Sequence, residues 1–390
     1  MQKKKLAILI NALEVAGAEK VVSLIINHFH KEFEIQLLLL NNTIQFELPV
    51  SNITVKTIDN SNLKARNRIK DILKIPLLSY RLKKYLKQND IPVCFSALNR
   101  SNFINCFLRI LKWNGKILIS ERSHTSSVYP IATFAGKTGR FLVKTLYKNA
   151  DFIIPNSYGI EFDLNKNFKL QNKFCVIYNP VNIAVQENDM QVPVEDIAFD
   201  SFTFSHVARL EKGKNHAVLL AAIHKIKDKD FKVLIIGQGQ QEEKIKQQAL
   251  AMGISDKIIF LGYRLNVVKY IAKSQCHIMT SDFEGFPNVL LEALACNTAI
   301  ISTDCPTGPR ELLTGTFDPH IQCRDIEKGK YGLLVPINDA DTLAKAMLLI
   351  MDDSGLRTKY AEAGKNRAKD FDLEIIMNQY ANLFNSTELL

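Results

Sequence analysis

Short apolar runs alternate with amphipathic stretches along most of the chain. Such runs are typical of strands buried on both faces, and apolar positions spaced three and four residues apart are typical of helices that cover a sheet. The alternation predicts an α/β fold in which helices connect parallel strands. Strands are expected at 6–10, 34–40, 53–58, 93–96, 116–120, 152–155, 174–178, 202–207, 232–236, 257–261, 277–280, 298–302 and 332–335.

This rhythm stops and restarts near the middle of the chain. Residues 185–200 contain five acidic residues and little periodicity, which is typical of a linker. A chain of 390 residues is long for one core and suits two domains. We therefore expect a Rossmann-like domain at 1–183, a linker at 184–200, a second Rossmann-like domain at 201–370 and a terminal helix at 371–390.

The composition excludes several classes of protein. Apolar residues make up 47%, so the chain is not disordered, and seven cysteines without a repeated short spacing predict neither a disulfide framework nor a zinc site. No apolar run is long enough to span a membrane. Lys3 to Lys5 before the first apolar run have the outline of a signal peptide, but Asn11 and Glu14 interrupt that run, and a buried strand is the better interpretation.

Positive charge gathers in the first half. Residues 1–180 carry 27 Lys and Arg against 12 Asp and Glu, whereas residues 181–390 carry 23 against 28. Much of the excess lies in Lys64 to Lys87, where nine basic residues, one acid and many apolar residues are interleaved. Such a segment suits an anionic membrane surface, or else an ordinary solvated helix. The chain has no recognisable nucleic-acid-binding motif, so we expect no nucleic acid partner.

Two carboxylates lie before and within one predicted helix. Glu284 precedes the helix start at Pro287, and Glu292 lies in the apolar run that extends the helix to Cys296, before Asn297 as a left-handed cap. A charge among leucines costs several kcal/mol unless it has a dedicated polar partner. A ligand hydroxyl is one such partner, and an arginine or a backbone amide is another.

Two cations follow the first strand of the second half. Arg209 can hold phosphate oxygens in bidentate fashion, and Lys214 adds a point charge. They stand at the carboxyl end of a strand, where ligands bind in open α/β sheets. Gly237 and Gly239 form a Gly-x-Gly sequence after the next predicted strand, which is a weak signal by itself.

Together these motifs resemble the donor site of the retaining GT-B glycosyltransferases of family 4, the glycosyl transferases group 1. Glu284 and Glu292 match the Glu-x7-Glu pair, and residues 208–215 match the Gly-Arg-Leu-x3-Lys-Asn element with Ala208 in place of glycine. The resemblance covers nearly the whole chain. It implies the GT-B fold, in which two Rossmann-like domains face each other across a cleft and the C-terminal helix crosses back to the N-terminal domain.

The resemblance also implies roles for individual residues. Glu284 lies near the transferred sugar and forms the catalytic set with Arg209 and Lys214, which hold the diphosphate, while Glu292 binds the nucleotide ribose. Further donor contacts are implied at Gly285, Phe286, Pro287, Asn288, Val289, Gly237, Gly239, Tyr263 and Arg264.

Acceptor contacts are implied in the first domain. Gly17 matches the family's glycine loop, and Asn99 and Arg100 follow a predicted strand. Arg122 and His124 follow another strand, where relatives place a histidine close to the reacting sugar. Either one contacts the sugar, or the two belong to a loop ion pair; neither is assigned as a catalytic base.

Other segments, among them 95–103, 155–157 and 177–180, resemble bacterial N-acetylgalactosaminyltransferases that extend undecaprenyl-diphosphate-linked oligosaccharides. This implies transfer of a hexosamine or hexose, best N-acetylgalactosamine, from a UDP-sugar to a polyprenyl-diphosphate-linked saccharide in surface-glycan or protein-glycan assembly. The enzyme would be cytoplasmic and peripheral on the inner face of the cytoplasmic membrane, with Lys64 to Lys87 against the lipid. The alternatives are a sugar-nucleotide epimerase of the same fold and a non-catalytic glycan-binding scaffold.

No cofactor and no metal are expected, because Arg209, Lys214 and the amides at a helix start can hold the departing diphosphate. Two Asp-x-Asp spacings, at 228–230 and 339–341, invite a metal interpretation. The first lies in a polar loop and the second precedes a helix as a cap.

Overall fold

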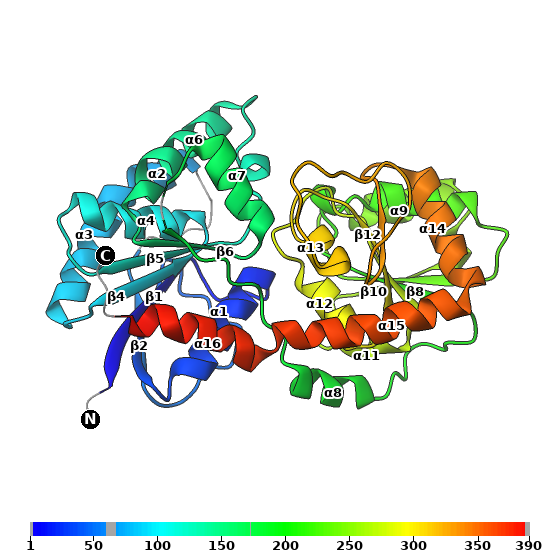
Figure 1. Cartoon of the computed structure of the whole chain (residues 1–390), viewed down its shortest axis with the longest axis horizontal. Coiled ribbons are helices and arrows are strands. Elements are labelled where there is room, and N and C mark those ends of the chain that lie inside the picture. Colours follow the sequence, from blue (N-terminus) through cyan, green and yellow to red (C-terminus); the bar gives the residue numbers. More distant parts are fainter. Residues whose placement is uncertain (1–2, 60–67, 172, 387–390) are drawn as a thin grey trace. The chain divides into compact units, whose positions relative to one another are not determined.

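Two sheets with their own helices organise residues 3–59, 68–171 and 173–386, the part of the chain that the computed structural model describes (Figure 1). Unit 1 comprises Met1–Asn179 and Ile376–Leu390, and unit 2 comprises Pro180–Ile375. The α/β architecture predicted from the alternation of apolar runs is confirmed.

Unit 1 contains a seven-stranded sheet with the order β3-β2-β1-β4-β5-β6-β7, in which neighbouring strands are parallel. Its strands are β1 (Lys4–Ile10), β2 (Phe33–Leu39), β3 (Ile53–Thr57), β4 (Val93–Ala97), β5 (Lys116–Glu121), β6 (Phe152–Pro155) and β7 (Lys173–Phe174). Its helices are α1 (Gly17–Phe29), α2 (Arg68–Leu73), α3 (Ile75–Gln88), α4 (Asn99–Ile110), α5 (Thr125–Val128), α6 (Phe134–Leu146), the 3-10 turn η1 (Tyr147–Asn149), α7 (Tyr158–Phe168) and most of α16 (Leu373–Asn385).

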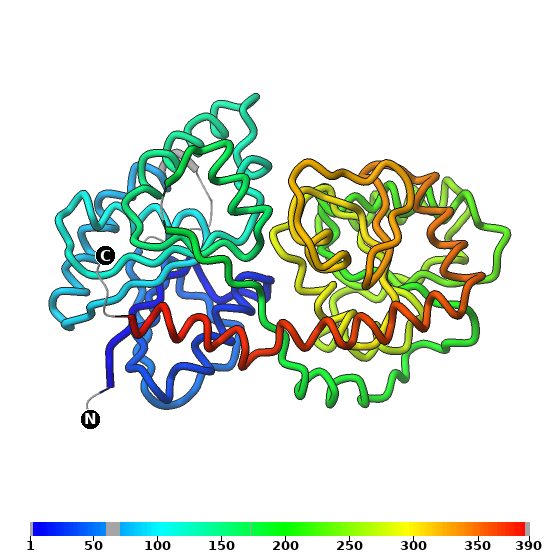
Figure 2. Tube along the Cα trace, viewed as in Figure 1, coloured from blue at the N-terminus to red at the C-terminus, as the bar shows by residue number. Residues whose placement is uncertain are grey.

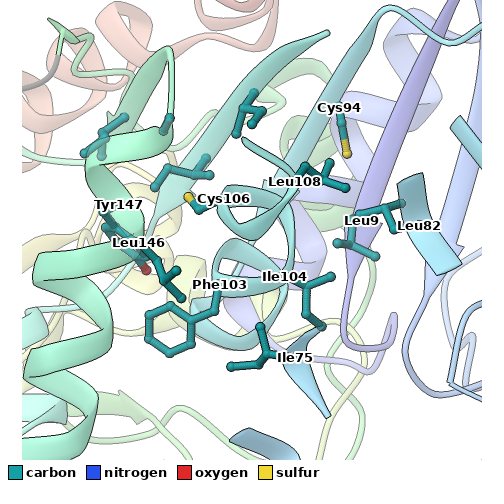
Figure 3. Close-up of a cluster of buried hydrophobic side chains, with 14 of the residues drawn as sticks. Leu9, Ile75, Leu82, Cys94, Phe103, Ile104, Cys106, Leu108, Leu146 and Tyr147 are labelled. Carbon is teal, nitrogen blue, oxygen red and sulfur yellow. The ribbon is translucent and has the colours of Figure 1, made fainter. Parts of the chain in front are cut away.

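One face of this sheet is covered by α3, α4, α6 and α7. Their apolar side chains form one buried cluster with the strands. Figure 3 shows Leu82 of α3 beside Leu9 of β1, with Ile104 and Leu108 of α4 and Leu146 of α6 in the same cluster. These residues repeat at helical spacing on helices and at alternate positions on strands, so the sequence pattern places them on the same face.

The opposite face is covered by α1 and α16. The ring of Phe384 on α16 lies 5.2 Å from that of Phe29 on α1 and 5.6 Å from that of Phe95 on β4. The ammonium of Lys116 donates to the carbonyls of Leu383 and Ser386 at 3.0 and 3.1 Å, where a cation complements the carboxyl end of a helix. Figure 2 shows the trace of α16 running beside the first elements of the chain.

Unit 2 contains a second seven-stranded sheet with the order β10-β9-β8-β11-β12-β14-β13. Its strands are β8 (Thr203–Val207), β9 (Lys232–Ile236), β10 (Ile258–Gly262), β11 (Cys276–Met279), β12 (Ala299–Thr303), β13 (Glu327–Lys328) and β14 (Leu333–Val335). Its helices are α8 (Ile183–Gln191), η2 (Lys212–Lys214), α9 (His216–Lys225), α10 (Glu242–Ala251), η3 (Ser255–Lys257), α11 (Val268–Lys273), α12 (Asn288–Ala295), α13 (Pro309–Thr314), α14 (Ala340–Asp352), α15 (Ser354–Ala368) and η4 (Lys369–Phe371).

Residues 184–200 differ from the expected linker. They carry most of α8, and the amide of Asn266 donates to the carbonyl of Asp189 in this helix at 3.1 Å. Val194 and Phe199 then pack against the outer strands of the second sheet. The segment is therefore part of unit 2, and its few apolar residues are the signal that its acidic composition obscured.

The strand β13 was not predicted, because two residues carry no periodicity. It is the one antiparallel neighbour in the second sheet. Arg310 of α13 donates to Glu327 of β13 at 2.9 and 2.7 Å and to Asp304 at 3.1 and 2.6 Å, and burial keeps these charge-assisted bonds strong. One arginine thus holds a short edge strand in place.

Candidate active site

The strand order of unit 2 reverses between β8 and β11. After β8 the chain continues outward to β9 and β10, and after β11 it continues in the opposite direction to β12 and β14. The loops that follow two such strands diverge and leave a crevice at the carboxyl edge of the sheet. Arg209 and Lys214 follow β8, and Glu284 follows β11, so the topology brings the two predicted catalytic segments to one place.

Lys214 and Glu284 are in direct contact at this edge of the sheet. The ammonium lies 2.5 Å from Oε1 of Glu284, and the side chains are 23% and 15% exposed. The two loops are also joined through the backbone, because the N–H of Asp282 donates to the carbonyl of Gly213 at 3.0 Å and the hydroxyl of Thr280 donates to the carbonyl of Lys214 at 2.9 Å. The cation and the carboxylate are therefore held together by a cross-linked pair of loops.

Gly237 and Gly239 bring the loop after β9 against the loop after β8. A Cβ on Gly237, whose φ is +142°, would lie 1.9 Å from the carbonyl oxygen of Ala208, and one on Gly239 would lie 2.5 Å from that of Leu210. The close approach allows backbone bonds from Ala208 to Ile236 and from Leu210 to Gln238, both of 3.0 Å. The glycines thus fix the backbone on either side of Arg209, which is a more specific role than leaving room for a cleft.

Arg209 extends from this fixed backbone into solvent. Its side chain is 65% exposed, and its partner is Glu211 at 3.0 Å, which is itself 47% exposed. Exposed ion pairs of this kind contribute little free energy. The guanidinium can therefore exchange Glu211 for an anionic ligand at small cost.

The segment between Glu284 and α12 is built into the fold of unit 2. Gly285, Phe286 and Pro287 are buried, and the ring of Phe286 lies 5.4 Å from that of Phe371. Gly308 has a φ of +89°, and a Cβ there would lie 2.7 Å from Cδ of Pro287. These predicted donor residues shape the backbone that positions Glu284.

The helix α12 begins after Pro287 and ends before Asn297, whose φ of +57° provides the left-handed cap, so the predicted helix is confirmed. Asn288 and Val289 lie in its first turn and are partly exposed. Glu292, one of the two predicted carboxylates, is 8% exposed on the same helix. The apolar residues around Glu292 in the sequence predicted this burial.

Tyr263 and Arg264 follow β10 on one edge of the sheet. Tyr263 is 45% exposed. The guanidinium of Arg264 lies 3.0 Å from Asp196 and donates to the hydroxyl of Tyr270 at 3.2 Å. Arg264 therefore ties the 192–200 segment to β10, and only Tyr263 of the two presents a largely unengaged side chain.

Three buried histidines, which we call the histidine cluster, were not predicted: His206 on β8, His216 at the start of α9 and His277 on β11. Burial lowers the pKa of His206 to about 4 and those of His216 and His277 to about 3, and the charge of Lys214 lowers the first two further. Nδ1 of His206 lies 2.9 Å from the carbonyl of Ile278, and Nε2 of each ring has no hydrogen-bond partner among the described residues. The cluster is uncharged at neutral pH. Histidines within strand runs are the signal that could have revealed it.

In unit 1 the strand order reverses between β1 and β4, and Asn99 and Arg100 follow β4. The amide of Asn99 donates to Oε2 of Glu121 at 3.2 Å. Arg100 pairs with Asp59 at 3.0 Å and with Asp71 at 3.2 Å. Arg100 is thus held within the unit.

Arg122 and His124 follow β5. Arg122 is 9% exposed and donates to Asn179 at 2.5 Å and to the hydroxyl of Ser120 at 3.0 Å. Nε2 of His124 lies 3.5 Å from Asp163, and burial lowers the pKa of His124 while Asp163 opposes that shift. Both have partners within unit 1, and their contact with a sugar stays a prediction, as does that of Gly17, which is exposed at the start of α1.

Glu121 is a buried carboxyl at the same edge of the first sheet, and the sequence analysis gave it no role. Oε2 accepts a hydrogen bond from the hydroxyl of Tyr147 at 2.7 Å, and Oε1 accepts one from Ser123 at 3.1 Å. Burial raises the pKa of Glu121 to about 7, although these hydrogen bonds lower it. An acid directly after an apolar strand is the signal that could have identified it.

The second Asp-x-Asp spacing, at 339–341, has structural partners. Asp339 accepts a hydrogen bond from the N–H of Thr342 at 2.9 Å as the cap of α14, and Asp341 lies 2.8 Å from Lys225. Within residues 3–59, 68–171 and 173–386, no group of three or more His, Cys, Asp or Glu side chains is arranged to hold a metal ion.

Comparison with known proteins defines the class. Residues 190–367 match the family model for glycosyl transferases group 1. The chain is similar, at 34% identity over 95% of its length and 96% of the relative's, to a Campylobacter jejuni enzyme named N-acetylgalactosamine-N,N'-diacetylbacillosaminyl-diphospho-undecaprenol 4-alpha-N-acetylgalactosaminyltransferase. The chain belongs to the glycosyl transferases group 1 family and is a glycosyltransferase.

Further relatives agree with this assignment. A second Campylobacter jejuni protein, named an α-1,4-N-acetyl-D-galactosaminyltransferase acting on a diphospho-undecaprenol-linked saccharide, is 25% identical over 97% of this chain and 98% of its own. Sucrose-phosphate synthase from Thermosynechococcus elongatus shares the fold with a TM-score of 0.80 at 20% identity, covering 98% of both chains. Anabaena HepE, solved in complex with UDP, has a TM-score of 0.77 at 17% identity, covering 97% of this chain and 99% of its own. The GT-B fold expected from the resemblance is confirmed.

None of the helices in the described part of the chain combines the length and the apolar character that crossing a membrane requires.

Proposed function

We propose that this glycosyltransferase moves an N-acetylhexosamine, best N-acetylgalactosamine, from a UDP-sugar to a saccharide carried on a polyprenyl diphosphate. The single observation that carries the proposal is the joint placement of Arg209, Lys214 and Glu284 at the strand-order reversal of unit 2. The names of the Campylobacter relatives, which specify N-acetylgalactosamine transfer and diphospho-undecaprenol acceptors, support the choice of substrates.

The chemistry follows from charge. As the bond between the anomeric carbon and the diphosphate oxygen breaks, negative charge grows on the leaving UDP. The exposed guanidinium of Arg209 and the ammonium of Lys214 stabilise that charge, and each exchanges part of its contact with Glu211 or Glu284 for phosphate oxygens. These cations do the work that a divalent metal does in other transferases, so we propose a reaction without metal and without cofactor.

Glu284 serves two purposes in this proposal. Without donor it neutralises Lys214 and holds the ammonium in the crevice at 2.5 Å. With donor bound, its carboxylate is next to the diphosphate site and accepts hydrogen bonds from hydroxyls of the transferred sugar, while Glu292 accepts those of the ribose. The acceptor hydroxyl then attacks from the face that the diphosphate leaves, its proton passes to the diphosphate, and the anomeric configuration is retained.

The acceptor would bind unit 1 at the carboxyl edge of its sheet, near Asn99 and Glu121. A polyprenyl tail would hold the acceptor in the membrane, and we propose that the reaction takes place at the inner face of the cytoplasmic membrane. The side chains described within Lys64 to Lys87 include Leu77 and Tyr80, which are 51% and 60% exposed on α3. This surface supports peripheral binding to anionic lipid.

The test is to incubate the protein with UDP-N-acetylgalactosamine and polyprenyl-diphosphate-linked saccharides in detergent, and to analyse products by mass spectrometry and NMR. We expect a product heavier by one N-acetylhexosamine, with retained configuration and with undiminished turnover in EDTA. Isomerised sugar nucleotide from donor alone would identify an epimerase instead. Binding without turnover for any donor would leave a scaffold, and loss of activity in EDTA would contradict the metal-free mechanism.

A further inference from the structure

The helix α6 and the loop before it present an unusual outer surface on unit 1. Ile131, Phe134 and Phe141 are 65%, 82% and 65% exposed, and three large apolar side chains exposed on one short segment are more informative than single exposed ones. Phe134 and Phe141 are seven residues apart and therefore lie on the same face of α6. Lys137 and Lys144 of α6 are exposed three residues after Phe134 and Phe141, which places them on the same side of the helix, and Lys148 is exposed in the 3-10 turn η1 that follows.

The charge of this surface is of one sign. Residues 122–150 contain five Lys and Arg and no Asp or Glu. Among the described residues no carboxylate pairs with the ammonium groups of Lys137, Lys144 or Lys148. In contrast, Arg140 faces inward, where its guanidinium stacks 4.5 Å from the ring centroid of Phe168. Arg140 therefore packs within unit 1, whereas Lys137, Lys144 and Lys148 are exposed to solvent.

The apolar end of the surface is rigid. Gly136 and Gly139 are buried because the preceding loop folds onto α6: a Cβ on Gly139 would lie 2.0 Å from the ring of Tyr129, and one on Gly136 would lie 1.9 Å from the carbonyl of Pro130. The side chain of Thr133 accepts a hydrogen bond from the N–H of Gly136 at 3.0 Å as the N-cap. The fold therefore holds Ile131 and Phe134 outward, although nothing in the described residues covers them.

We propose that this surface, which consists of Ile131 in the preceding loop, Phe134, Lys137, Phe141 and Lys144 on α6, and Lys148 on η1, docks unit 1 on an anionic lipid bilayer. The aromatic and aliphatic side chains enter the boundary between headgroups and acyl chains, and the lysines bind the lipid phosphates, the usual arrangement for helices that lie on a membrane. The charge complementarity selects anionic lipid over a protein partner, because a protein partner would need an acidic surface that also accepts three separated apolar side chains.

This docking surface differs from the predicted Lys64 to Lys87 contact. On α3 the guanidinium of Arg81 donates to the carbonyl of Ile58 at 3.3 Å and the ammonium of Lys83 donates to that of Leu111 at 2.5 Å, so part of its positive charge stabilises unit 1 itself. Within the part of the chain that the structure describes, the ammonium groups of Lys137, Lys144 and Lys148 make no such hydrogen bond to the backbone. The inference rests on the proposed function only in that a lipid-linked acceptor makes membrane docking useful, and it can be tested without turnover.

The test is co-sedimentation of the full chain with vesicles of phosphatidylglycerol and phosphatidylethanolamine, and with phosphatidylcholine vesicles, at several salt concentrations. We expect binding to the anionic vesicles that weakens as salt rises. Changing Lys137, Lys144 and Lys148 to Gln should lower the partition coefficient about fivefold for each lysine. Phe134→Ser with Phe141→Ser should lower it by roughly tenfold or more.

Matched controls come from unit 2, where Leu250 and Leu265 are 72% and 87% exposed. Leu250→Ser with Leu265→Ser removes similar exposed apolar groups and should leave vesicle binding unchanged. Leu77→Ser with Tyr80→Ser tests the α3 surface in the same assay. Turnover with a detergent-dissolved acceptor should stay within about twofold of wild type in the α6 variants, which shows that they are folded.

Several outcomes overturn the proposal: no binding by the wild type, equal binding to phosphatidylcholine, or α6 variants that bind as the wild type does while the α3 variant does not. Vesicle binding that depends on α6 in a protein without transferase activity would leave the docking surface intact and refute the proposed function instead. The two failures are therefore distinguishable.

Discussion

Replacing Lys214 separates its chemical contribution from its structural one. Lys214→Met keeps the length of the side chain and removes its charge. Loss of one electrostatic stabiliser of a leaving group lowers turnover by roughly 10² to 10³. Because Glu284 is only 15% exposed and its contact with Lys214 is 2.5 Å, the same change leaves a partly buried carboxylate unpaired and should lower the free energy of unfolding by about 1–3 kcal/mol.

The double variant separates these two effects. Adding Glu284→Gln removes the unpaired carboxylate, so we expect the free energy of unfolding to return toward the wild-type value while turnover stays low. Lys225→Met is the matched control, because its pair with Asp341 is 42% and 72% exposed and should contribute no more than about 0.5 kcal/mol. The control should also retain full turnover.

The measurement has to report on unit 2, and the single tryptophan, Trp113, lies in unit 1. Proteolysis of the full chain at increasing urea concentrations, followed through the peptides released from unit 2, gives the free energy of unfolding of unit 2. Trp113 fluorescence gives the corresponding reference for unit 1. Initial rates with the UDP-sugar give turnover. Turnover of Lys214→Met within tenfold of wild type, or a double variant no more stable than Lys214→Met, would refute the role of this pair.

Three further predictions concern the glycine turn at Gly237, the histidine cluster and the buried carboxyl of Glu121. Gly237→Ala should destabilise unit 2 and abolish donor binding measured by calorimetry. Gly253→Ala is the control, because Gly253 also has a positive φ but no atom lies within 4 Å of its Cβ, so this change should lower stability alone. Equal UDP affinity in the two variants would contradict the role of Gly237. Folding lowers the pKa values of the histidine cluster, so the contribution of these residues to stability is complete above pH 6.5 and is lost as the pH falls toward 4 and then 3. A free energy of unfolding of unit 2 that does not change over this pH range would contradict the burial of the three histidines. Glu121 has a raised pKa, so unit 1 should lose about 3 kcal/mol as pH rises from 4.5 past 7, and Glu121→Gln should remove that dependence; identical pH curves by Trp113 fluorescence would exclude it.

Much of the fold could be predicted because local patterns determine it. Runs such as 152–155 and 232–236 became β6 and β9 with the same bounds, since a buried parallel strand is continuously apolar. Helix α12 was predictable from Pro287 and Asn297. The strand β13 and the packing of 184–200 were not, because both depend on tertiary partners such as Arg310 and β10 that no local pattern contains.

The candidate site shows the same division. The motif positions of Arg209, Lys214 and Glu284 were readable, and the strand-order reversal that joins them is a property of the sheet. The contact of Gly237 with the carbonyl of Ala208 was not readable, because it is an approach between loops nearly thirty residues apart. Glu121 was not predicted as a site residue, because burial in the folded chain raises its pKa to about 7 and no local sequence pattern shows that burial.

The covering of the first sheet by α16 has a consequence for biosynthesis. The aromatic face formed by Phe29 and Phe95 is completed by Phe384, which the ribosome adds only after all of unit 2 has been made. A nascent chain would therefore carry a completely synthesised unit 2 while the sheet of unit 1 still exposes apolar side chains to chaperones. A truncation that removes Phe384 should leave the newly made protein prone to aggregation, even though every predicted donor-site residue is present.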